Sequence, residues 1–170
     1  MIAISYILSA EKILKIEVLS GGGSDPGGKQ SIIKVNGIDY SRHGRGFNVV
    51  VLSGSNGDVI STGIFDTHCC QHEANRMIVY LNSIQNGHIV LISIGDDAAI
   101  SMTAEAELAI HALGAKTPLT AGWMSYGSSR FRGTFALVTR KGRDKPTWFV
   151  EKSADKREGP SHIKMIVPLP

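Results

Sequence analysis

Two apolar runs joined by a polar turn dominate the stretch from residue 44 to residue 68. The runs cover residues 47–52 and 59–65, and Asn56-Gly57 lies in the turn between them. Because Asn and Gly tolerate positive φ angles, this pattern predicts a β-hairpin. Residues 49–52 have no polar alternation, which is typical of a strand buried on both faces. The stretch therefore predicts a buried hairpin around which the other elements pack.

The rest of the chain predicts short strands and two helices. The strands are expected at 12–19, 31–35, 38–40, 88–95, 133–140, 147–152 and 163–167, and the helices at 71–85 and 103–113. The glycine-rich residues 20–28 predict a flexible loop. The apolar stripe of the second helix is expected at Ala104, Leu108 and Ala112. These elements predict an α+β fold, with antiparallel, sandwich-like sheets and two covering helices, as a single domain over residues 1–170.

Length and composition narrow the class of protein. A chain of 170 residues can bury a core without disulfide staples. No apolar stretch reaches the roughly 20 residues of a membrane span, and residues 1–10 lack the basic start of a signal peptide. The net charge is only +3, and the basic residues between 130 and 157 accompany no nucleic-acid-binding motif. We therefore expect neither a membrane span nor nucleic acid as a partner.

Cys69 and Cys70 are the two cysteines of the chain, and they are adjacent. Adjacent cysteines cannot join distant segments, so a vicinal bridge, a bridge between subunits and free thiols remain the alternatives. His68 and His72 flank them with the i, i+4 spacing of one helix face. Structural zinc sites draw their ligands from two separated pairs, a pattern that four ligands crowded into five residues do not match. We expect no metal and no cofactor.

Three separate positions predict a sugar-binding site. Arg45 lies between two glycines, Asp96-Asp97 ends a strand, and Trp123 follows a glycine. Neighbouring strand residues face opposite sides, so one Asp is expected to face a pocket and the other to cap the turn. A guanidinium, a carboxylate and a ring suit the hydroxyls and apolar face of a sugar. Two alternatives remain: Trp123 in the core, and Arg45 paired with Asp66 or Asp97.

Catalysis is not predicted by the sequence. It contains no nucleophile elbow, phosphate-binding loop or dinucleotide fingerprint. A general acid–base pair would need a second convergent carboxylate beside Asp96-Asp97, and none is evident. We therefore expect a binding protein that is not an enzyme.

Several motifs in order resemble the interleukin-like EMT inducer and pancreatic-derived-factor family, also called the GG domain. They include residues 44–52, Gly57-Asp58-Val59, Phe65-Asp66-Thr67, Leu81-Asn82, 87–92, Asp96-Asp97, Leu113-Gly114, Gly122-Trp123, 135–138 and Arg140-Lys141-Gly142. The resemblance extends over about residues 14–169 and is specific in order and spacing. Within this family the chain is similar to the lectin-like, non-catalytic stem domain of protein O-mannose N-acetylglucosaminyltransferase, which binds β-linked N-acetylglucosamine.

The resemblance implies a sugar site made by Arg45, Asp97, Trp123 and Met124. The family has Arg where this chain has Met124, so Arg130 or Arg132 would have to replace its hydrogen bonds. It implies a free-standing lectin for N-acetylhexosamines, which we expect to be extracellular and a homo-oligomer, with a trimer as the first guess. The alternative is a secreted, cytokine-like ligand of a protein receptor, with Cys69 or Cys70 linking two chains.

Overall fold

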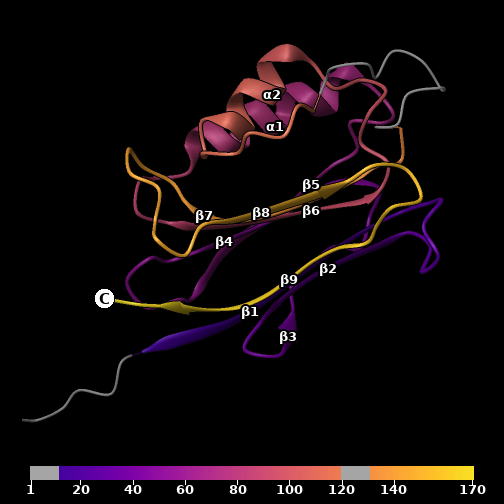
Figure 1. Ribbon diagram of the computed structural model, residues 1–170. Helices are drawn as coiled ribbons and strands as arrows, with labels where there is room; N and C mark the ends of the chain where they lie inside the picture. The colour runs from indigo at the N-terminus through magenta and orange to yellow at the C-terminus, as the bar shows by residue number, and fades with distance from the viewer. Residues whose placement is uncertain (1–11, 120–130) are drawn as a thin grey trace, which may run out of the picture.

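The computed structural model describes residues 12–119 and 131–170, which form two helices packed on a pair of facing sheets (Figure 1). The elements are β1 (Ile13–Gly22), β2 (Gln30–Val35), β3 (Ile38–Asp39), β4 (Gly46–Leu52), β5 (Val59–Phe65), α1 (Gln71–Ser83), β6 (Ile89–Asp96), α2 (Ala104–His111), β7 (Thr134–Arg140), β8 (Val150–Ala154) and β9 (Ser161–Pro168). The predicted α+β class with two covering helices is confirmed. Neither helix is long and apolar enough, within this described part, to cross a membrane.

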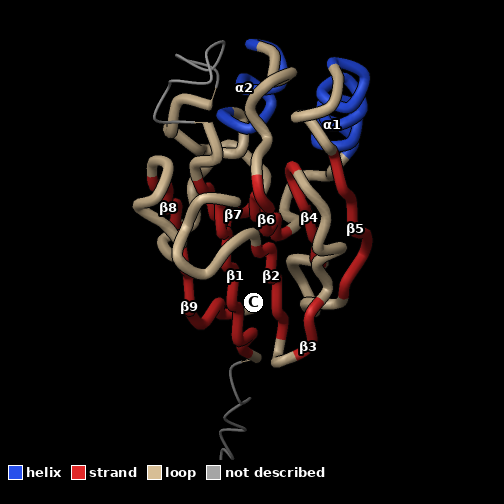
Figure 2. Tube along the Cα trace, turned by 90° about the vertical axis from the view of Figure 1, so that its right-hand side faces the viewer, coloured by secondary structure: helices blue, strands red, loops and turns tan. Residues whose placement is uncertain are grey.

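The strands form two layers that meet at one end. Beneath the helices lie β5, β4, β6, β7 and β8 in that order, and the second layer holds β3, β2, β1 and β9 (Figure 2). The layers join where Gly21 and Gly22 of β1 pair with Gly95 and Asp96 of β6. This pairing is parallel, whereas the other strand pairs of the described residues are antiparallel, as predicted.

The predicted burial of the central strand on both faces is confirmed, because every residue of β4 is buried. Phe47, Val49 and Val51 pack in the core beneath α1 and α2. The intervening Val50 and Leu52 pack in a second core between the two sheets. Since side chains alternate along a strand, one apolar run supplies both cores. The strand is therefore fixed from both sides.

The predicted loop at residues 20–28 is confirmed from Gly23 onward, but residues 20–22 belong to a strand. β1 continues through Gly22, and Ser20 donates a hydrogen bond to the carbonyl of Ile94 at 2.6 Å. A Cβ atom on Gly22 would lie 2.1 Å from the carbonyl oxygen of Arg132. The glycines are thus needed for the close approach of chain segments at the joined end.

Helix α2 buries a different face from the predicted one. Ala106, Ala109 and Ile110 are buried, whereas Leu108 is 65% exposed, and Ala104 and Ala112 are exposed as well. Both stripes have helical spacing, so spacing alone does not decide between them. The buried stripe joins the core beneath the helices, where α2 packs against α1. The predicted stripe Ala104, Leu108 and Ala112 is therefore wrong.

Candidate functional site

The candidate site lies at the end where the two sheets join. β2, β4, β7 and β9 begin at this end, and β1, β5 and β6 finish there. Most of the buried polar side chains gather here: Ser20, Asp25, Ser31, Asn48, Thr67, Ser93, Asp97, Thr134 and Ser161. Buried polar groups need hydrogen-bond partners, so this end is held by specific bonds more than by apolar packing.

Arg45 forms a two-pronged ion pair with Asp66. Its Nε lies 3.0 Å from Oδ1, and its Nη2 lies 2.8 Å from Oδ2. The hydrogen bonds to Asp66 raise the pKa of the guanidinium, and the nearby charge of Asp96 adds to this effect. The Arg45 side chain is still 40% exposed. The pair therefore holds the guanidinium in one orientation while free N–H donors face the solvent.

Gly46 explains why the backbone can place Arg45 here. Its φ angle is +90°, and a Cβ atom at this position would lie 2.1 Å from the carbonyl oxygen of Phe65. Any other residue would clash with the end of β5 and strain the backbone. The start of β4 thus lies directly against the segment that carries Asp66.

The two aspartates after β6 have different environments. The Asp97 side chain is 2% exposed, with Oδ2 3.0 Å from His68 Nδ1, and its Oδ1 accepts the backbone N–H of Ala99 at 2.9 Å. Asp96 has a φ angle of +63°, which is uncommon for a residue with a side chain, and it lines a surface hollow. Asp97 therefore caps the turn after β6, and Asp96 faces the hollow.

The hollow is small and polar. Its volume is about 120 Å³, and it is lined by Lys29, Gln30, Ser31, His43, Gly44, Arg45, Gly95 and Asp96. His43 has a φ angle of +56°, so it and Asp96 are two lining residues with side chains in the left-handed region. Such conformations persist where the surrounding structure fixes them, and they cluster at functional sites. The hollow combines a guanidinium, a carboxylate, a hydroxyl and an amide in one place.

Of the predicted site residues, Arg45 lines the hollow, whereas Asp97 does not line it and is bonded to His68 and Ala99. Trp123 and Met124 lie outside the described residues. Asp97, Trp123 and Met124 as sugar contacts stay predictions. His43 and Gln30 were missed, and no local pattern marks them, because folding alone brings them beside Arg45.

Arg132 lies near Asp96 on the side of Gly23. A Cβ atom on Gly23 would be 2.1 Å from Asp96 Oδ1 and 3.7 Å from Arg132 Cδ, so both side chains border that glycine. The Arg132 φ angle is +60°. One of the two arginines suggested as a replacement for the missing donor at Met124 is therefore close to the acid of the hollow.

Both cysteines are free thiols at the start of α1, so the structure contains no vicinal bridge between them. The hydrogen bond to Cys70 is the main cause that raises the pKa of Cys69 to about 11. An exposed thiol with this pKa is mostly protonated at neutral pH and reacts slowly. Throughout the described ranges, no group of three or more His, Cys, Asp or Glu side chains is arranged to hold a metal.

Comparison with known proteins places the chain in a family. The model of the family described as "Interleukin-like EMT inducer" matches residues 45–143, more than half of the chain. The chain belongs to this family, as its motifs predicted. The match begins at Arg45 and includes β4 to β7, so it contains Arg45, Gly95 and Asp96 of the hollow, whereas the other lining residues precede it.

Two groups of relatives illustrate the similarity. Protein FAM3C of Rattus norvegicus is 32% identical over 116 residues, which is 66% of this chain and 50% of that protein. Protein FAM3C of Danio rerio is 30% identical over 129 residues, or 74% of this chain and 52% of that protein. The human cell migration-inducing and hyaluronan-binding protein is 31% identical over 98 residues, or 58% of this chain and 7% of that protein. The chain thus spans about half the length of these FAM3C relatives. The similarity to the lectin-like stem domain of protein O-mannose N-acetylglucosaminyltransferase stays a prediction.

Proposed function

We propose that this protein is a carbohydrate-binding protein that recognises N-acetylhexosamines, such as N-acetylglucosamine, at the hollow beside Arg45. The observation that carries the proposal is the meeting of the Arg45 guanidinium and the Asp96 carboxylate in one exposed polar hollow. Sugar hydroxyls both donate and accept hydrogen bonds, so a fixed donor and a fixed acceptor side by side suit them. No catalytic step is part of the proposal.

Arg45 and Asp96 have distinct roles in this proposal. Arg45 donates to a ring hydroxyl or to the acetamido oxygen from the N–H groups that Asp66 leaves free. Asp96 accepts from the hydroxyls, and the neighbouring Asp97 holds the turn after β6 through Ala99. Trp123 and Met124 remain proposed contacts for the sugar ring and the acetyl methyl group. The small volume of the hollow suits one sugar unit.

Two further considerations support a sugar as the ligand. The printed name of one group of relatives includes hyaluronan binding, and hyaluronan is a polysaccharide that contains N-acetylglucosamine. A single shallow site binds weakly, so we also propose a homo-oligomer that presents several sites, with a trimer as the first state to test. Because the family is named for interleukin-like inducers, a secreted, cytokine-like ligand of a protein receptor is the second candidate.

Retention on an immobilised N-acetylglucosamine matrix tests the proposal. We expect Arg45→Gln and Asp96→Asn to abolish retention, and Asp97→Asn to weaken it through the turn that follows Asp96. Asp144→Asn is the matched control, since Asp144 is an exposed acid on a distant loop. Each variant is compared at equal folded fraction, measured by its melting curve. Full retention of Arg45→Gln and Asp96→Asn would overturn the site.

The second candidate predicts a different result. A cytokine-like ligand would bind its receptor whether or not N-acetylglucosamine is added. Neither the unchanged protein nor any of the variants above would be retained on the sugar matrix. Non-reducing electrophoresis adds an independent measurement, because Cys69 or Cys70 would then link two chains. A covalent dimer that is indifferent to N-acetylhexosamines would replace the lectin proposal.

A further inference from the structure

β5 is an open edge of the sheet beneath the helices, away from the hollow. In the described part of the chain it pairs with β4 alone, and Figure 2 shows it at the margin of the layer below α1. Its seven residues contain no charge and no proline, and Ile60 is 50% exposed. Edge strands normally carry charged residues or proline, which prevent pairing with other chains. The opposite edge, β8, carries Glu151 and Lys152.

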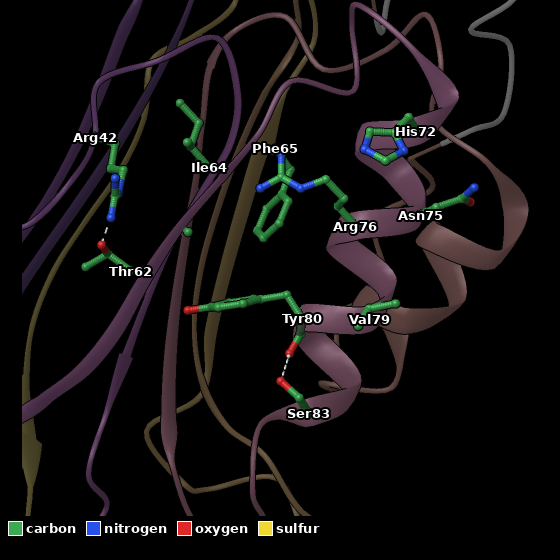
Figure 3. Close-up of a pocket in the computed structure, with 11 residues that line it drawn as sticks. Arg42, Thr62, Ile64, Phe65, His72, Asn75, Arg76, Val79, Tyr80 and Ser83 are labelled. Atoms are coloured by element: carbon green, nitrogen blue, oxygen red, sulfur yellow. Dashed lines mark hydrogen bonds between the residues drawn. The ribbon is translucent and has the colours of Figure 1, made fainter.

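A groove lies along this open edge. It has a volume of about 680 Å³, and its lining comes from β5, α1 and Arg42. The lining includes Thr62 and Ile64 from one face of β5 and Gly63 and Phe65 from the other. In Figure 3, Arg42 and Ile64 lie on one side of the strand, and Tyr80 and Arg76 lie on the other. An occupant of the groove therefore lies against the strand edge itself.

The charge of the groove is positive. Among the described residues, its lining contains the cationic Arg42 and Arg76, together with His72, and no Asp or Glu. Arg42 donates from Nε to Thr62 at 3.1 Å, and Arg76 donates from Nη1 to Glu73 at 2.6 Å. The other N–H groups of these arginines are available, because a guanidinium has five donors. The Arg76 side chain is 51% exposed. The two guanidinium groups therefore lie on opposite faces of one free strand edge.

The α1 side of the groove also offers apolar surface. Val79 is 70% exposed, and the Tyr80 ring packs against Phe65 with ring centres 5.2 Å apart. The Tyr80 hydroxyl bonds to Ser61 of β5 at 2.7 Å, which fixes the ring beside the strand. A rigid aromatic wall beside an open edge can receive the side chain of an added strand.

We propose that this groove docks an extended, acidic peptide segment of a partner protein, which adds as a strand to the free edge of β5. Its backbone pairs with the unpaired N–H and C=O groups of β5. Its side chains alternate between the two faces, so neighbouring acidic residues meet Arg42 on one face and Arg76 on the other. An apolar side chain beside them contacts Val79 and Tyr80.

Charge decides between this occupant and a second copy of the chain. If two β5 strands paired around Thr62, the Arg42 side chain bound to each Thr62 would meet its counterpart across the pair. Two positive charges that face each other across the strand pair disfavour that dimer, whereas carboxylates on a partner segment neutralise the charge of Arg42. The observations therefore favour an acidic partner segment.

Titration with three capped peptides of about nine residues tests the proposal. The first alternates Thr and Val around a central Glu-Glu, the second replaces Glu-Glu with Lys-Lys, and the third N-methylates alternate residues of the first. We expect only the first to bind and to protect alternate amides of 59–65 from hydrogen exchange. Arg42→Gln and Arg76→Gln each weaken binding about fivefold, and Arg140→Gln, a distant exposed arginine, leaves it unchanged.

Other results would overturn the proposal. Equal binding of the N-methylated peptide shows ionic attraction without strand pairing. Self-association that Ile60→Lys abolishes assigns the edge to a second copy. Hyaluronan fragments that bind in an Arg76-dependent way, with no peptide binding, assign the groove to an acidic sugar. Excess N-acetylglucosamine is added in a parallel titration, and it leaves peptide binding unchanged because the hollow is elsewhere.

Discussion

The two ends of the sheet pair are built in opposite ways. At the joined end, buried polar side chains link the strands, as when Ser20 donates to the carbonyl of Ile94 and accepts from the N–H of Phe135. At the other end, apolar residues such as Leu52 and Ile89 close the inter-sheet core, and tight turns connect the strands. Apolar packing is non-directional, whereas hydrogen bonds fix positions.

The comparison shows which end can hold a precise site. Arg45, Asp96 and the residues around them are placed by bonds with defined directions, including those between Asn48 and the backbone of Gly44 and Gly46. The apolar end contributes mainly free energy of unfolding, through buried side chains such as Leu52 and Ile89. We therefore expect changes at the two ends to separate stability from ligand binding.

The largest loss of stability is expected from Leu52→Ala at the apolar end. Leu52 is fully buried between the sheets, and removing a buried leucine side chain costs about 2–5 kcal/mol. Chemical denaturation measures this loss. Retention on N-acetylglucosamine per folded molecule is expected to stay at the level of the unchanged protein. Lost retention in the folded fraction would show that the two ends are coupled.

A smaller loss of stability with a larger loss of binding is expected from Asp25→Ala at the joined end. The buried Asp25 carboxylate accepts the backbone N–H of Gly22 at 2.8 Å and that of Gly159 at 3.2 Å. Removing it leaves one buried donor and one partly buried donor unpaired, at a cost of about 1–3 kcal/mol. Because Gly22 pairs with Asp96, the hollow shifts as well.

Two measurements check the Asp25 prediction: the free energy of unfolding and sugar retention at equal folded fraction. Asp25→Asn is the matched variant, since its amide oxygen keeps one acceptor, and it should lose less of both. If Asp25→Ala lowered stability and left retention intact, the joined end would not position the hollow, and the proposed difference between the ends would fail.

The comparison also explains what the sequence can predict. The unbroken apolar run of β4 and the Asn-Gly turns are local signals, and they correctly predicted the central hairpin and its burial. The path of Gly21-Gly22 depends on Arg132 and on β6, which are distant in sequence, so composition alone indicated a loop. The buried face of α2 depends on its packing against α1 and the core beneath the helices, which spacing does not reveal.

The candidate site, like the fold, was predictable only where a local signal in the sequence marks it. Arg45 was found because two glycines isolate it, and its pairing with Asp66 was one of the stated alternatives. That Asp96 lines the hollow follows from a positive φ angle that residue types do not encode. The contribution of His43 and Gln30 follows from the meeting of three separate segments. Such non-local contacts require the folded structure.

The smallest effect is expected from Glu17→Gln, in the middle of β1 and away from both ends. Glu17 Oε1 lies 2.9 Å from His162 Nε2 and 3.4 Å from Lys164 Nζ. Burial raises the pKa of Glu17, but the hydrogen bonds from His162 and Lys164, with the nearby charges, outweigh it, so the pKa falls below its ordinary 4.5. A lowered pKa in the folded state contributes stability above pH 4.5, which is lost as the pH falls through the folded-state pKa.

Glu17→Gln should therefore lower the free energy of unfolding at pH 7 by less than about 1 kcal/mol, because solvent screens this partly exposed pair. The difference from the unchanged protein should shrink as the pH falls below 4.5 and vanish once Glu17 is protonated in both states. Urea denaturation across this pH range measures it, with Glu158→Gln as the control at an exposed acid elsewhere. A stability difference that grew on acidification would contradict a lowered pKa of Glu17. A loss of sugar retention would show that the hollow depends on the middle of β1 as well as on the joined end.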